Sequence, residues 1–85
     1  MSKLDKKLIF NIIQFGKAIY SVECEWSRCG ALIKRVGYQN VVRVMVKMNR
    51  KLKFETGDQF LNYIQKVATE EAIKNLERGD DAEST

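Results

Sequence analysis

The chain has 85 residues with no histidine and no proline, and its 15 basic and 11 acidic side chains give a formal net charge of +4. That length allows one small domain, because a second would bury too little apolar surface. Hydrophobic residues make up 45% and charged residues 31%, a balance typical of a folded soluble protein. Ser-His-Asp and Cys-His catalysis and histidine metal sites all need the missing histidine, so we expect no enzyme, no cofactor and no metal.

The start of the chain is charged and is not followed by an apolar stretch with a small-residue cleavage site, so we predict no secretory signal. No apolar run approaches the roughly 18 residues of a membrane span. The two cysteines, Cys24 and Cys29, are too few for a zinc site or a disulfide framework. On one helix they would lie about 140° apart. We therefore expect a cytoplasmic protein with no membrane partner and two separate, buried thiols.

The beginning of the chain has the period of an amphipathic helix. Ser2 and Asp5 have the spacing of a capping box, in which a hydroxyl and a carboxylate bond the free amides of a helix start. The apolar residues that follow recur every three or four positions and share one helical face: Leu4, Leu8, Ile12, Phe15 and Ile19. We predict a helix from Ser2 to about Gly16.

Two periods compete between residues 19 and 36. A helix would have Ser21 as its N-cap and Gly37 just past its end. Its apolar face would consist of Val22, Trp26, Cys29, Ile33 and Val36. Apolar and polar residues also alternate strictly over residues 20–27, which is the period of a half-buried strand. We favour a helix over residues 21–36 and keep the strand as the alternative.

Residues 41–56 alternate in a way that favours a β-hairpin. The apolar side of the alternation consists of Val42, Val44, Val46, Met48, Leu52, Phe54 and Thr56. A three-residue loop, Asn49-Arg50-Lys51, would keep the apolar residues of two strands on one face. We predict a basic antiparallel hairpin over about 41–56, with its apolar face on the helices and Lys47 opposite Lys53 on the outer face.

Thr56 and Gln59 have the spacing of a second capping box, and the apolar positions after them predict a helix over about 57–78. Arg78-Gly79 would end this helix and leave residues 80–85 as an acidic disordered tail. The predicted fold is one compact α+β domain over residues 1–79, with two N-terminal helices, the hairpin and a C-terminal helix. The alternative is a helix, a four-stranded antiparallel sheet and a helix.

The charges are distributed unevenly along the chain. Residues 1–25 have a net charge of +1, residues 26–54 of +8 and residues 55–85 of −5. The middle segment contains no acid and eight bases, namely Arg28, Lys34, Arg35, Arg43, Lys47, Arg50, Lys51 and Lys53. A cationic segment of this kind favours an anionic partner.

Most of these bases would lie on the outer face and tip of the hairpin, where they could neutralise phosphates beside a stacking aromatic. The candidate nucleic-acid-binding residues are Lys34, Arg35, Tyr38, Arg43, Lys47, Arg50, Lys51 and Lys53. We favour RNA over DNA, because Gln39 and Asn40 next to Tyr38 suit unpaired bases. A merely solvated basic face and a patch for an acidic protein are the alternatives.

We therefore predict a small non-enzymatic regulatory protein that binds nucleic acid, with RNA favoured over DNA. The alternative is a phage- or plasmid-type inhibitor or antitoxin-like protein that neutralises a host enzyme such as a nuclease, alone or together with RNA. A domain of 85 residues with an exposed hairpin edge also gains stability from pairing, so we expect a homodimer or a higher oligomer.

Overall fold

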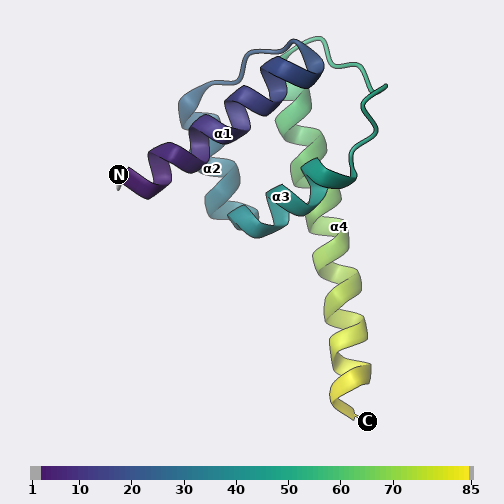
Figure 1. The fold of residues 1–85 in the computed structure, drawn as a ribbon. Coiled ribbons are helices and arrows are strands. Elements are labelled where there is room, and N and C mark those ends of the chain that lie inside the picture. The colour runs from purple at the N-terminus through teal and green to yellow at the C-terminus, as the bar shows by residue number, and fades with distance from the viewer. Residues whose placement is uncertain (1–2, 85) are drawn as a thin grey trace.

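The computed structural model describes the backbone of residues 3–84 and the side chains of residues 5–74. It contains α1 (Lys3–Tyr20), α2 (Trp26–Val36), α3 (Tyr38–Lys47) and α4 (Gly57–Ser84). Helix α2 contacts the other three helices and α4 packs on both α2 and α3, while the C-terminal part of α4 extends away from them (Figure 1). The described residues form no strand, so the predicted α+β fold and its four-stranded alternative are both wrong.

The predicted first helix is confirmed, and α1 continues past Gly16 to Tyr20. It ends because Ser21 adopts a left-handed conformation with a φ of 57°. The amide of Ser21 still donates to the carbonyl of Lys17 at 3.2 Å, and the amide of Val22 donates to the carbonyl of Gly16 at 3.2 Å. Ser2, the first residue of the predicted capping box, lies outside the described residues.

The second helix begins later than predicted. Helix α2 starts at Trp26, and residues 21–25 form a non-helical connection in which no strand is present. The prediction of Ser21 as the N-cap is therefore wrong, since this residue ends α1 instead. The end of the helix is confirmed, because Gly37 has a φ of 85° and its amide donates to the carbonyl of Ile33 at 2.8 Å.

The predicted hairpin is wrong over residues 41–47, which belong to α3. The buried residues of this helix are Val41, Val44 and Met45, and Met48 just past its end is buried as well. They recur with the period of one helical face. Val46, which the hairpin would bury, is 79% exposed. Valine favours strands only weakly, and packing of this helical face against α4 overrides that preference.

The remaining half of the predicted hairpin is a connection without helix or strand, which we name the basic loop (residues 48–56). The second capping residue is confirmed, since the amide of Gln59 donates to the Thr56 hydroxyl at 3.2 Å. Gln59 in turn accepts from the amide of Glu55 at 2.9 Å. Helix α4 continues through the predicted end at Arg78-Gly79 to Ser84, so it includes residues 80–84 of the expected tail.

An aromatic cluster joins the end of α1, the basic loop and the start of α4. Phe60 of α4 is completely buried, and its ring lies 5.5 Å from that of Tyr20 and 5.7 Å from that of Phe54 between ring centres. Phe15 stacks on Phe60 at 6.1 Å. This cluster fixes the base of the basic loop to the helical core. Within the described part of the chain, no helix has the length and apolar character that a membrane crossing requires.

Candidate nucleic-acid interface

The predicted site residues are distributed over three parts of the fold. Lys34 and Arg35 lie in the last turn of α2, and Arg43 and Lys47 lie on α3. The other three bases, Arg50, Lys51 and Lys53, lie together in the basic loop. All seven basic residues are exposed. The hairpin face that would have brought most of them together is absent.

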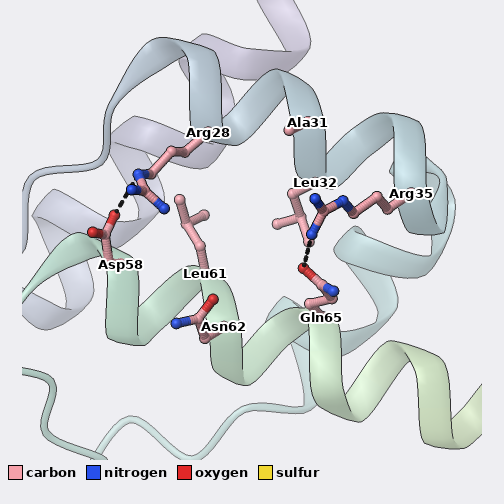
Figure 2. Close-up of a pocket in the computed structure, with 8 residues that line it drawn as sticks. All are labelled: Arg28, Ala31, Leu32, Arg35, Asp58, Leu61, Asn62 and Gln65. Carbon is pink, nitrogen blue, oxygen red and sulfur yellow. Dashed lines mark hydrogen bonds and ion pairs between the residues drawn. The ribbon is translucent and has the colours of Figure 1, made fainter.

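The two bases of α2 point in different directions. Lys34 lines a cavity of about 240 Å³ between α1 and α2, together with Asp5 and Ile9. Arg35 turns toward α4, where its Nη1 donates to Oε1 of Gln65 at 3.4 Å (Figure 2). Lys34 therefore lies toward α1 and Arg35 toward α4.

One of the two predicted basic site residues on helix α3, Lys47, already forms an ion pair within the fold. The Nζ of Lys47 lies 3.4 Å from Oε1 of Glu71 on α4. An exposed pair of this kind contributes little to stability, but it partly neutralises the charge that Lys47 would present to an anion. Arg43, one turn earlier on the same helical face, is exposed.

Tyr38, the predicted stacking aromatic, is the first residue of α3 and is half-buried. Its ring packs against the hydrophobic core, and its hydroxyl accepts a hydrogen bond from Nδ2 of Asn11 on α1 at 3.4 Å. These contacts give the side chain a role in holding α3 against α1, and little of the ring is presented to a base.

The basic loop is anchored on the inside and charged on the outside. Leu52 and Phe54 are half-buried and pack against the core, whereas Lys51 and Lys53 between and before them are exposed. The ring of Phe54 meets that of Tyr20 edge-on at 5.0 Å. The alternation in the sequence is therefore real, but it belongs to a single irregular segment on the core and not to a paired strand.

The start of the loop is held by backbone hydrogen bonds around Asn49. The hydroxyl of Tyr20 donates to the carbonyl of Asn49 at 3.0 Å, and the amide of Leu52 donates to the same carbonyl at 3.1 Å. The side-chain oxygen of Asn49 accepts from the amide of Lys51 at 2.9 Å. Asn49 thus closes a tight turn that presents Arg50 at its outer edge.

A shallow hollow of about 480 Å³ lies between the loop and the end of α1. The loop side of it includes Arg50, Lys51 and Lys53, and the helix side consists of Ile19, Tyr20 and Ser21. The carbonyl end of a helix has a partial negative charge, which attracts cations. The three bases of the loop therefore lie beside an end of a helix that favours cations.

Burial raises the pKa of Tyr20, as does the neighbouring Tyr63, while the charge of Arg50 opposes the rise. Tyr20 therefore keeps its proton at neutral pH and remains the donor to Asn49. Arg50 and Tyr20 line the same hollow beside the end of α1.

Arg28, the eighth base of the cationic segment, belongs to a different structure. Its Nε lies 3.2 Å from Oδ1 of Asp58 and 3.8 Å from Oε2 of Glu25, at the edge of a polar groove of about 100 Å³ between α2 and α4 (Figure 2). Leu61 and Gln65 also line this groove. With both carboxylates beside it, Arg28 serves to hold α2 on the start of α4.

Among the described side chains, no three cysteine or carboxylate groups lie together in a way that could hold a metal ion. Comparison with protein-family models, with curated proteins and with solved structures found no significant match.

Proposed function

We propose that the protein is a small, cytoplasmic, non-enzymatic regulatory protein that binds nucleic acid through the basic loop, with RNA favoured over DNA. The observation that supports this most directly is the trio Arg50, Lys51 and Lys53. All three are exposed, and among the described residues none forms an ion pair with a carboxylate. Arg28 and Lys47, in contrast, are already paired within the fold.

The loop's geometry suits a strand of phosphates. Leu52 packs inward between Lys51 and Lys53, and the side chains of both lysines are exposed. Arg50 adds a planar guanidinium, which can bond two phosphate oxygens at once.

A single strand fits this loop better than a duplex. The three bases occupy a short irregular segment beside a shallow hollow, and they do not follow one face of a helix that could enter a major groove. A flexible strand can adjust its backbone to such a segment. Because unpaired segments are the usual targets of sequence-specific RNA recognition, we favour RNA as the partner.

The test is a titration of a short labelled RNA, followed by fluorescence anisotropy at several salt concentrations. The same sequence as single-stranded DNA and as duplex DNA serves for comparison. Three phosphate contacts on a single strand predict that the logarithm of the association constant falls by about 2 per decade of salt. We expect the RNA to bind at least as tightly as the single-stranded DNA and more tightly than the duplex.

Absence of binding to all three oligonucleotides at low salt would rule the proposal out. Tighter binding to the duplex would replace the single-strand interpretation with a duplex one. A preparation that carries no nuclease-sensitive material and still captures a host enzyme favours the inhibitor or antitoxin-like alternative.

A further inference from the structure

Helices α1 and α2 pack against each other and border a cavity of about 240 Å³ (Figure 1). The residues that line it are Asp5, Ile9, Gly30, Ile33 and Lys34. Ile9 belongs to the hydrophobic core and Ile33 packs against it, whereas Asp5 and Lys34 are exposed. A cavity of about 150 Å³ with apolar walls is large enough to bind benzene. The space between α1 and α2 is therefore large enough for a small organic molecule.

Gly30 lines this cavity at a position where the fold does not require a glycine. Each of the other glycines in the described part of the chain has close neighbours or a positive φ that explains it, namely Gly16, Gly37 and Gly57. A Cβ atom at Gly30 would meet only the end of the Ile9 side chain, at 3.5 Å, which is an ordinary contact. Alanine also favours a helix interior over glycine. An isolated glycine inside a helix usually has a packing or functional reason, and here the reason left is the open space beside it.

Lys34 is the charged lining residue to which the described part of the fold offers no partner. Its ammonium forms no ion pair and no side-chain hydrogen bond with a described residue. Asp5, in contrast, already has an interaction partner. The next cation along α2, Arg35, turns away to Gln65 of α4. A molecule in the cavity would thus meet one available cation, which favours a ligand with a carboxylate.

We propose that this cavity binds a small apolar monocarboxylic acid, with its apolar body between Ile9 and Ile33 and its carboxylate at the ammonium of Lys34. Removal of the apolar body from water supplies most of the affinity. The carboxylate stays at the surface, where it accepts a charge-assisted hydrogen bond. Apolar walls with one well-placed charged group are typical of small-molecule sites. The site shares no lining residue with the hollow beside the basic loop, so it does not depend on nucleic-acid binding.

Octanoate is a suitable probe, because octanol and octylamine have the same chain with a neutral and a cationic head. Each compound is titrated into the isotope-labelled full chain and followed by nuclear magnetic resonance. We expect octanoate to shift the amide signals of residues 5–9 and 30–34 in a saturable manner, with a Kd on the order of 1 mM or below. Octanol and octylamine should bind at least about threefold more weakly. Nuclear Overhauser contacts from the ligand chain to the methyl groups of Ile9 and Ile33 place the apolar body.

Three variants separate the contributions of charge and space. Lys34→Gln should weaken octanoate binding at least about threefold and leave the affinity for octanol unchanged. Arg35→Gln is the matched control, because it removes a neighbouring cation that faces α4, and both affinities should stay as in wild type. Gly30→Leu puts a side chain into the cavity and should abolish the binding of both compounds. Thermal unfolding followed by circular dichroism checks that each variant is folded.

The proposal is wrong if octanoate at about 10 mM gives no saturable shifts in wild type, or if the shifts lie outside the cavity. It is equally wrong if octanol or octylamine binds as tightly as octanoate, or if K34Q and R35Q weaken octanoate binding by the same factor. The wild-type titrations decide the matter without a variant that must fold. A chain that binds octanoate and no RNA would contradict the nucleic-acid function and leave this site in place.

Discussion

A variant with Arg50, Lys51 and Lys53 all changed to Glu is expected to bind single-stranded RNA at least about 100-fold more weakly than wild type. Each base can form a charge-assisted hydrogen bond to a phosphate, and such bonds contribute at least about 1 kcal/mol each. Their combined loss is about 3 kcal/mol, and the new carboxylates repel the strand further. Fluorescence anisotropy at fixed salt measures the change directly.

The matched control reverses three exposed lysines elsewhere, with Lys7, Lys66 and Lys74 changed to Glu. Both variants undergo the same change in net charge, so a difference between them reports on position and not on overall charge. We expect the control to bind within about threefold of wild type. Equal losses in the two variants would show that net charge attracts RNA and that the loop is not a site. Far-UV circular dichroism checks that both variants remain helical.

Gly57→Ala is expected to lower the free energy of unfolding by about 3 kcal/mol. Gly57 is the first residue of α4, and the connection before α2 crosses directly over it. A Cβ atom here would overlap the carbonyl oxygen of Glu23 and come within 2.9 Å of the Cα of Cys24. Because these atoms of Glu23 and Cys24 belong to the backbone, either the connection between α1 and α2 or the start of α4 must move.

Thermal unfolding followed by circular dichroism measures this effect, with a fall in Tm of more than about 10 °C expected for a domain of this size. Gly30→Ala is the matched control. A Cβ at Gly30 would meet only the end of Ile9 at 3.5 Å, an ordinary contact, and alanine favours a helix interior by about 1 kcal/mol. We expect G30A to be as stable as wild type or slightly more so. If G57A unfolds at the wild-type temperature, the close packing between the connection and α4 is incorrect.

The helices that the sequence predicts well are those with local signals at their ends. Thr56 caps α4 through the amide of Gln59, as the spacing of the two residues predicts. Gly37 ends α2 in a conformation that favours glycine. Such capping signals depend on a few neighbouring residues, so the packing of the rest of the chain has little effect on them.

The hairpin prediction was wrong for a reason that depends on the whole fold. Val41, Val44 and Met45 fit a helical face as well as the alternating valines fit a strand, and the short apolar run contains both periods. Only the presence of α4 beside α3 makes the helical face the buried one. In the second half of the predicted hairpin, Leu52 and Phe54 do alternate with basic residues. The segment that would pair with them as a strand is helix α3.

The candidate site was partly predictable, because charge is read from the sequence without knowledge of the fold. The acid-free segment identified Arg50, Lys51 and Lys53, which the structure brings together in one loop. It could not show that Arg28 and Lys47 are paired with carboxylates from α4. It also could not show that α2 begins at Trp26, because a helix start without a side-chain cap leaves little trace in a sequence.

Nuclear magnetic resonance of the isotope-labelled full chain, recorded during titration with a short single-stranded RNA, shows directly whether the basic loop is the nucleic-acid interface. The predicted result is that the largest shifts of the amide signals map to residues 49–54 and 19–21, on the two sides of the hollow. Signals of α4 around Lys66 and Lys74, exposed lysines outside the loop, should change little. Shifts that are largest on α4, or that spread evenly over all exposed lysines, would contradict the proposal.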